Sequence, residues 1–410
     1  MTEKTAQAAP ASVPSDHIMG VYQRAPLAFV RGEGARLYTE DGEAYLDCMA
    51  GIAVNALGHA NPKLVEALKD QAEKLWHVSN IFTIPGQEKL ANLLTGATFA
   101  DVVFFTNSGT EAIECAIKTA RKYHWKNGQP DRIDVIGFDG SFHGRTLAAV
   151  NASGNPSYLE GFGPPMPGFV HLPFGDFEAI EAAVGETTAA IILEPVQGEG
   201  GARAWTEPML RDIRALCDRT GTLLIYDEIQ CGLGRTGKLF AYEWAGAAAP
   251  DIMAVAKALG GGFPVGACLA TAEAAKGMTP GSHGSTYGGN PLAMAVGVAA
   301  VEELVKPELM AHVREVAGYF TQQLSGLKDR FPDVVVDIRG KGLLIGVKLA
   351  TPNRELMQHA RDQHLLLAGG GDNCVRLLPP LNLTLEEARE AIERFEAACE
   401  AARSKAKAAA

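Results

Sequence analysis

Between about residue 100 and residue 275, short apolar runs alternate with segments whose apolar residues recur at helical spacing. The runs predicted as buried strands are 102–105, 133–138, 189–193, 222–226 and 252–255. Between two of them, residues 110–124 place Ile113, Ala116, Ile117 and Ala120 on one helical face. Strands that alternate with helices predict an α/β fold whose mostly parallel sheet is covered on both faces. Ligands of such sheets bind at the carboxyl ends of the strands.

The pattern changes after a long helical stretch that follows Pro291. Strands are expected at 334–338, 343–349 and 375–378, and helices at 354–363 and 385–402, which predicts a smaller α+β domain. Residues 36–49 alternate like a hairpin around Asp41-Gly42, and we expect this hairpin to pack with the C-terminal domain. The predicted organisation is a disordered tail (1–20), an N-terminal segment (21–60), a large ligand-binding domain (61–300) and a small domain (301–410).

Composition and charge exclude several functional classes for this chain. The 410 residues are 47% hydrophobic, enough for sizeable cores, and they carry a formal charge of −11. That charge argues against general binding to nucleic acid or to an anionic membrane, because either would repel the chain. No apolar run approaches the roughly 20 residues that span a bilayer, and residues 1–16 lack the apolar core of a signal peptide. We therefore expect a cytoplasmic protein.

Cysteine and histidine usage points to neither a disulfide framework nor a metal site. The seven cysteines are scattered, odd in number and never in a CxxC pair, so we expect reduced thiols. The ten histidines form no HExxH or comparable cluster, so no metal is expected. His59, His77, His143 and His283 are expected to pack or to form hydrogen bonds.

The segment from Asn107 to Glu111 directly follows the first predicted strand. Ser108 and Thr110 at a helix start, with Gly109 between them, leave backbone N–H groups that point outward. Those groups and the helix dipole can bind a phosphate. A plain helix cap is the alternative for this segment taken alone.

A second feature lies at the end of the strand predicted over 222–226, where Asp227 and Glu228 follow the apolar run. An aspartate at the carboxyl end of a buried strand can hold a protonated ring nitrogen as an ion pair. Such an aspartate can equally cap a turn, so this feature alone leaves both interpretations open.

A third feature is Lys257, which ends an apolar run and precedes the glycines 260–262. Burial disfavours the charged amine and lowers its pKa, which makes it nucleophilic. A lysine that reaches to solvent from a strand end is the alternative. Together the three features supply a phosphate site, a partner for a ring nitrogen and a lysine for a Schiff base, which is the set that pyridoxal phosphate requires.

The sequence resembles the class III (subgroup II) aminotransferases of fold type I over residues 21–400. The stretches that carry the resemblance are GIAVNALGH at 51–59, LWHVSN at 75–80, SFHGRT at 141–146, EPVQGEGG at 194–201 and GSHGSTYGGNP at 281–291. It implies a homodimer with shared active sites, a large domain with a mostly parallel sheet and a smaller α+β domain. The cofactor-binding residues that it implies are Ser108, Gly109, Thr110, Phe142, Asp227, Glu228, Ile229, Gln230, Lys257 and Thr286.

The resemblance also assigns roles at the cofactor. Phe142 and Ile229 would enclose the ring, Asp227 would keep its nitrogen protonated, and Gln230 would lie near the phenolic oxygen. Thr286 would bind the phosphate from the neighbouring subunit. Lys257, once displaced by the substrate amine, would move the proton between substrate and cofactor, so that Lys257 and Asp227 are the catalytic pair.

The substrate-binding residues that the resemblance implies are Arg145, Ser285, Glu199, Arg376 and Tyr22. Arg145 would grip a carboxylate bidentately. Glu199 would cover Arg376 while the amino donor is bound and release it for the α-carboxylate of the second substrate. A structural ion pair between domains is the alternative for these two residues.

The resemblance implies transfer of the δ-amino group of N2-acetylornithine to 2-oxoglutarate, which would yield N-acetylglutamate 5-semialdehyde and glutamate in arginine biosynthesis. Alternative donors are succinylornithine, succinyldiaminopimelate and ornithine. Two other classes remain open: a non-catalytic binding protein of the same fold, and a fold-type-I mutase or decarboxylase.

Overall fold

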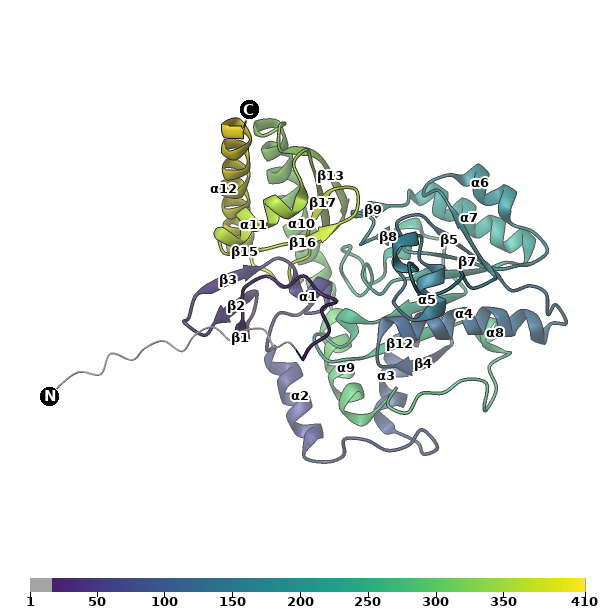
Figure 1. The fold of residues 1–410 in the computed structure, drawn as a ribbon. Helices are drawn as coiled ribbons and strands as arrows, with labels where there is room; N and C mark the ends of the chain where they lie inside the picture. Colours follow the sequence, from purple (N-terminus) through teal and green to yellow (C-terminus); the bar gives the residue numbers. More distant parts are fainter. Residues whose placement is uncertain (1–16, 410) are drawn as a thin grey trace.

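The computed structural model describes residues 17–409 (Figure 1). Its largest sheet has seven strands in the order β4-β12-β11-β10-β7-β5-β6. They are β4 (Val102–Thr106), β5 (Asp134–Phe138), β6 (Phe169–Leu172), β7 (Thr188–Leu193), β10 (Leu223–Asp227), β11 (Ile252–Val255) and β12 (Gly266–Ala270). Neighbouring strands pair in parallel, except that β12 runs antiparallel to β11 and to β4. The α/β fold with a mostly parallel sheet, predicted from the alternating pattern, is confirmed.

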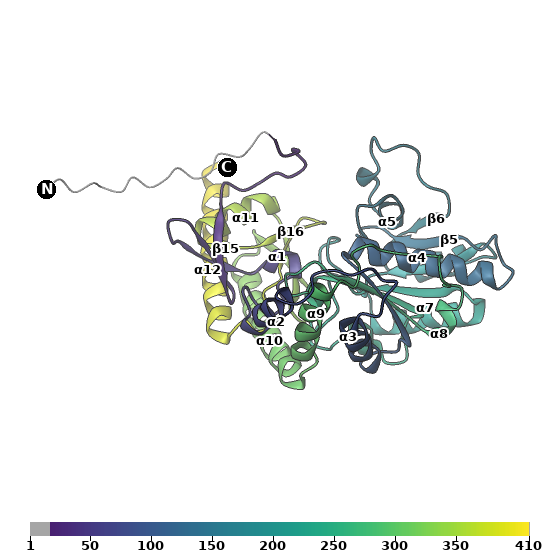
Figure 2. The same ribbon diagram turned by 90° about the horizontal axis from the view of Figure 1, so that it is seen from below.

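Helices cover both faces of this sheet (Figure 2). The helices in this part of the chain are α2 (Pro62–Ala72), α3 (Pro85–Gly96), α4 (Gly109–Lys126), α5 (Leu147–Ala152), α6 (Phe177–Ala183), α7 (Glu207–Thr220), α8 (Ala272–Ala275) and α9 (Pro291–Leu304). Within β10, Leu223 and Ile225 belong to the core cluster beneath α4, whereas Leu224 and Tyr226 belong to the cluster beneath α7. Because both faces are buried, β10 reads as a continuous apolar run rather than an alternating one.

Local sequence signals set the ends of the helices that position the site. Ser108 caps α4 by accepting the Glu111 N–H at 3.3 Å. Thr206 caps α7 in the same way, and Gly221 ends that helix in the left-handed conformation. Asn290 caps α9, which has Pro291 in its first turn.

The C-terminal part of the chain forms a second layered unit. Its four-stranded sheet has the order β13-β14-β17-β16. The elements are β13 (Val335–Lys341), β14 (Leu344–Leu349), β16 (Ala368–Gly370), β17 (Cys374–Leu377), α10 (Pro307–Arg330), α11 (Asn353–Asp362) and α12 (Leu385–Ala409). The helix predicted to end at residue 402 therefore continues to Ala409.

A third sheet combines strands from the N-terminal segment with one strand from the C-terminal part of the chain. The strands β1 (Phe29–Glu33), β2 (Arg36–Thr39) and β3 (Ala44–Asp47) form an antiparallel meander, and β3 pairs in parallel with β15 (Leu365–Leu366). The expected hairpin corresponds to β2 and β3. The tail expected over 1–20 falls mainly on residues 1–16, which lie outside the described residues.

The remaining short elements are α1 (Ala50–Ala53), β8 (Val196–Gln197), β9 (Arg203–Ala204) and the 3₁₀ turns Pro156–Tyr158, Ala241–Ala245 and Lys257–Leu259. Within residues 17–409, no helix has both the length and the apolarity to cross a membrane.

Candidate functional site

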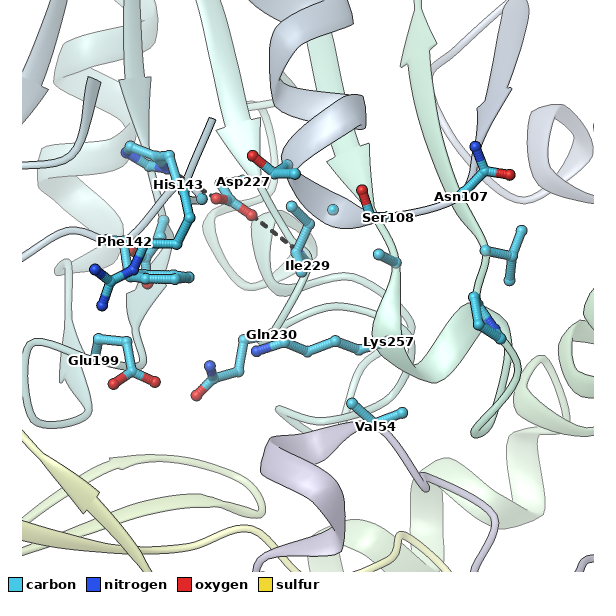
Figure 3. Close-up of a pocket in the computed structure, with 18 of the residues that line it drawn as sticks. Val54, Asn107, Ser108, Phe142, His143, Glu199, Asp227, Ile229, Gln230 and Lys257 are labelled. Carbon is cyan, nitrogen blue, oxygen red and sulfur yellow. Dashed lines mark hydrogen bonds and ion pairs between the residues drawn. The ribbon is translucent and has the colours of Figure 1, made fainter. Parts of the chain in front are cut away.

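A cavity of about 440 Å³ lies at the carboxyl ends of the large sheet's parallel strands (Figure 3). β4 ends two residues before Ser108, β10 ends at Asp227, and β11 ends two residues before Lys257. Parallel strands bring such chain segments to one edge of the sheet. The residues predicted from sequence that line the cavity are Ser108, Gly109, Thr110, Phe142, Arg145, Glu199, Asp227, Ile229, Gln230 and Lys257.

The amino terminus of α4 forms one wall of the cavity. A side chain at Gly109 would place its Cβ 2.9 Å from Cδ1 of Ile229, so glycine lets the start of α4 approach Ile229 without displacing that side chain. Backbone N–H groups in the first turn of a helix have no intrahelical acceptor, and the helix dipole adds partial positive charge there. Thr110 adds a hydroxyl, with its Oγ1 2.9 Å from Oγ1 of Thr146. This wall can bind an anion such as a phosphate.

Asp227 ends β10 with its side chain only 3% exposed. Its Oδ1 accepts the Ile229 N–H at 3.0 Å, and its Oδ2 lies 2.8 Å from Nδ1 of His143. The carboxylate is therefore held in one orientation at the cavity. Nε2 of His143 is buried and has no hydrogen-bond partner among the described residues.

Lys257 begins a 3₁₀ turn and has φ of +45°. Residues other than glycine rarely adopt this left-handed backbone conformation. Such backbone strain is concentrated at functional sites. Burial lowers the pKa of its amine to about 8, although the negative charge of Glu199 opposes the shift. Figure 3 shows the Lys257 side chain extended across the cavity, with its nitrogen beside Gln230.

Phe142 and Arg145 belong to the loop that follows β5. The Arg145 guanidinium lies 3.9 Å from the centre of the Tyr158 ring and 5.6 Å from that of Phe142. Arg145 is exposed and has no ion pair with an acidic side chain in the described part of the chain. The Arg145 guanidinium group is thus available to bind a carboxylate that enters the cavity.

Arg376, on β17, is almost completely buried behind the cavity. Its Nη1 lies 2.7 Å from Oε1 of Glu199 and donates to Oε1 of Gln230 at 3.0 Å. Its Nε donates to the carbonyl oxygen of Gly369 at 3.0 Å. The expected pair of Glu199 and Arg376 is therefore in contact at the edge of the cavity.

Glu228, which the sequence predicted as a cofactor-binding residue, directly follows Asp227. It does not line the cavity, because its carboxylate points the other way and accepts the N–H groups of Ala241 at 2.6 Å and Tyr242 at 2.8 Å. Complete burial raises the pKa of this carboxyl to about 8. The chain turns directly after β10, and the neighbouring residues Asp227, Ile229 and Gln230 line the cavity instead.

Three other predicted residues also lie away from this cavity. Tyr22 is 75% exposed and does not line it. Ser285 and Thr286 line a separate hollow of about 400 Å³ on the other side of Asn107. Ser285 Oγ accepts the Gly288 N–H at 2.9 Å and is 3.3 Å from Nδ2 of Asn107.

Two buried groups in the site carry no role in the sequence-based account. His143 was expected only to pack or to form a hydrogen bond, and Glu194, which lines the cavity, received no assignment. The available signal for Glu194 was its position directly after the apolar run 189–193, the same position that drew attention to Asp227 after its strand.

The sequence family described as Aminotransferase class-III matches residues 19–399. The chain belongs to the class III aminotransferases. Acetylornithine aminotransferase 2 of Caulobacter vibrioides is 72% identical over 391 residues, which cover 95% of this chain and 96% of that protein.

Solved structures of two aminotransferases agree with this fold. The N-acetylornithine aminotransferase of Stenotrophomonas maltophilia K279a matches with a TM-score of 0.82 at 38% identity, over 94% of this chain and 98% of that one. The ornithine aminotransferase of Toxoplasma gondii ME49 matches with a TM-score of 0.91 at 32% identity, over 95% of this chain and 94% of that one.

Class III aminotransferases depend on pyridoxal phosphate. The donor set of the cavity fits that cofactor. The amino terminus of α4 suits the phosphate, the buried Asp227 carboxylate suits a protonated ring nitrogen, and Lys257 has the lowered pKa of a nucleophilic amine. Phe142 and Ile229 supply apolar walls for a flat ring.

Proposed function

We propose that this class III aminotransferase transfers the δ-amino group of N2-acetylornithine to 2-oxoglutarate, which yields N-acetylglutamate 5-semialdehyde and glutamate in arginine biosynthesis. The observation that carries the proposal is the pairing of Glu199 with Arg376 beside a cavity in which Arg145 is unpaired. The names of the Caulobacter and Stenotrophomonas relatives support the choice of acetylornithine as donor.

The charges of the two substrates explain why such a pair is useful. Acetylornithine carries one carboxylate, whereas 2-oxoglutarate carries two. In our proposal Arg145 binds a carboxylate of each substrate, and Glu199 neutralises Arg376 while the donor is bound. Glu199 then turns away, so that Arg376 binds the second carboxylate of 2-oxoglutarate. An unpaired buried arginine would otherwise carry a large desolvation cost in the first step.

The cofactor residues in this proposal are those gathered at the cavity. Ser108, Gly109 and Thr110 would bind the phosphate, and Phe142 with Ile229 would enclose the ring. When bound, pyridoxal phosphate supplies an aldehyde that reacts with amines and a ring that accepts the electron pair of the substrate carbon.

The remaining cavity residues hold or move protons. Asp227 would hold the proton on the ring nitrogen, because its buried carboxylate stabilises the positive charge. Gln230 would donate from its amide to the phenolic oxygen, since its Oε1 is already used by Arg376. Lys257 would bind the cofactor covalently and then move the proton of the substrate carbon with its Nζ.

We also propose a cytoplasmic homodimer with shared active sites. Residues 75–82 expose four large apolar side chains, those of Leu75, Trp76, Ile81 and Phe82, and this density of exposed apolar surface is typical of an interface. Thr286 and Ser285, which lie outside the chain's own cavity, would then complete the cavity of the partner subunit. Sedimentation equilibrium tests the dimer, and a monomer at micromolar concentration would contradict it.

Donor preference tests the reaction itself. With 2-oxoglutarate as acceptor, kcat/KM is measured for acetylornithine, succinylornithine, succinyldiaminopimelate and ornithine. We expect acetylornithine to be among the best donors and ornithine to be at least about tenfold poorer, because its charged α-amine must be desolvated. A preference for ornithine would contradict the proposal.

The same preparation separates the proposal from the other two classes. After pyridoxal phosphate is added and unbound cofactor is removed by gel filtration, a non-catalytic protein would retain no cofactor absorbance. A mutase or decarboxylase would consume the donor without requiring 2-oxoglutarate. An aminotransferase produces one glutamate for each 2-oxoglutarate consumed.

A further inference from the structure

Glu194 is a buried carboxylate that lines the cavity and directly follows β7. Its Oε1 accepts the backbone N–H of Phe142 at 2.7 Å, and its Oε2 accepts the backbone N–H of Gly198 at 2.8 Å. The first contact reaches the loop after β5, and the second reaches the loop that carries Glu199. One side chain therefore connects two loops that follow neighbouring strands of the sheet.

Both contacts lead to groups that bind cofactor or substrate in our proposal. Phe142 is the aromatic wall of the cavity. Gly198 lies against the amide of Gln230 so closely that a Cβ there would be 2.1 Å from its Oε1. The same Oε1 accepts the hydrogen bond from Arg376. A shift of the Gly198 backbone would thus displace Gln230 and, through it, the guanidinium of Arg376.

We propose that Glu194 is a positioning residue that fixes Phe142 and the backbone on which the Glu199 side chain turns. This inference rests on the proposed function. With Gly198 held, the release of Arg376 requires only side-chain rotations of Glu199, one residue further along. Without the anchor, the loop itself would move, and the cavity would lose the geometry of Phe142 and Gln230 together.

A carboxylate suits this place better than an amide because both contacts need an acceptor. Glutamine has a single carbonyl oxygen, and its NH₂ group would face one of the two N–H donors. Ionisation of Glu194 has a cost, because burial and the nearby negative charge of Asp227 raise its pKa to about 7, while the charge of His143 lowers it. The two backbone N–H groups offset part of that cost.

The test compares Glu194→Gln with the wild-type holoenzyme. We expect the visible circular dichroism of the bound cofactor to fall by at least half, because Phe142 is no longer held. We also expect the single-turnover rate constant with 2-oxoglutarate to fall about 10- to 100-fold, since a displacement of about 1 Å can cost 10² in rate. The rate constant with acetylornithine should fall less, because that step does not require Arg376 to be released.

Two further variants keep the test decisive. Glu243→Gln is the matched control, since Glu243 also accepts a backbone N–H, that of Phe240 at 2.7 Å, but does not line the cavity. Its dichroism and both rate constants should stay within twofold of wild type. If Glu194→Gln does not fold, Glu194→Asp is used instead, because aspartate retains two acceptor oxygens on a shorter side chain. Its cofactor dichroism and its rate constant with 2-oxoglutarate should fall in the same direction but by less.

Glu194 has no positioning role if the substituted enzyme loses thermal stability while its dichroism and both rate constants stay within twofold of wild type. Equal losses in the two half-reactions would also overturn the inference, because they would show no link to Arg376. Failure of the proposed function is distinguishable, because it would appear in the wild-type protein as absent cofactor absorbance or absent amino transfer.

Discussion

The guanidinium of Arg376 lies 2.7 Å from the carboxylate of Glu199, yet the two side chains differ sharply in exposure, at 1% and 29%. Arg376 also donates to Gly369 and Gln230, so it keeps hydrogen-bond partners when Glu199 leaves. Glu199, which can reach solvent, is therefore the partner that can move. A buried pair contributes little to stability but can act as a switch. In the proposed switch, this difference in exposure makes Glu199 the side chain that moves.

Replacing Lys257 with alanine should abolish covalent attachment of the cofactor and lower kcat by about 10³-fold or more, because the proposed nucleophile and proton carrier are the same side chain. The measurements are kcat and the absorbance of the protein after borohydride reduction and denaturation. Lys238→Ala is the control, since Lys238 donates to the carbonyl oxygen of Glu243 and does not line the cavity. Retention of covalent cofactor in Lys257→Ala would point to a different lysine.

The amine of Lys257 in the cofactor-free protein should titrate near pH 8 rather than 10.5. The shift is downward because burial disfavours the charged form, so roughly half of the amines are neutral at pH 8. Stability from this group is present at high pH and is lost as pH falls from about 10.5 through 8. Carbon-13 methylation of the lysines followed by NMR titration tests the value, with Lys257→Ala used to identify the signal. Titration near pH 10.5 would contradict it.

Asp227→Asn should lower kcat about 10- to 100-fold, because a hydrogen bond between charged groups is replaced by a neutral one. His143→Ala should cost less, since it removes only one of the two contacts that orient the Asp227 carboxylate. If His143 acts through Asp227, its effect should largely disappear in the double variant. Additive losses in kcat would show that His143 acts independently.

The buried carboxyl of Glu228 should make the protein less stable as pH rises. Its folded pKa of about 8 lies above the ordinary 4.5, so the folded state binds its proton more tightly. The stability that this group contributes is full below about pH 4.5 and is lost as pH rises through about 8. The melting temperature of Glu228→Gln, relative to wild type, should therefore improve between pH 5 and pH 8.5. A difference that does not change with pH would contradict the raised pKa.

Much of the large sheet was predictable because buried parallel strands leave continuous apolar runs. The strands around Ile191, Ile225 and Val255 carry that pattern, and their carboxyl ends located the site. β12 escaped prediction because its Gly-Ala-Cys-Leu-Ala run has low strand propensity and is stabilised by pairing with β11 and β4. Such tertiary pairing leaves no local signal.

The residues of the site also differ in how far the sequence alone predicts them. Asp227 ends β10 and Lys257 follows β11, so their positions in the sequence were enough to predict that both line the cavity. Glu228 could not be separated from its neighbour, because only the folded backbone decides which side chain faces the cavity. Glu194 lies 52 residues from Phe142 and 4 residues from Gly198 in the sequence. No sequence pattern predicts the hydrogen bond to Phe142.

The sharpest test of the proposed switch is the single-turnover rate constant of Arg376→Ala in each of the two half-reactions. The rate constant with acetylornithine should stay within about threefold of wild type, while that with 2-oxoglutarate should fall about 10²-fold or more, because the second carboxylate loses its charged partner. Arg339→Ala, which removes an arginine paired with Asp372 outside the cavity, should change neither. Equal losses in both half-reactions of Arg376→Ala would contradict the switch between Glu199 and Arg376.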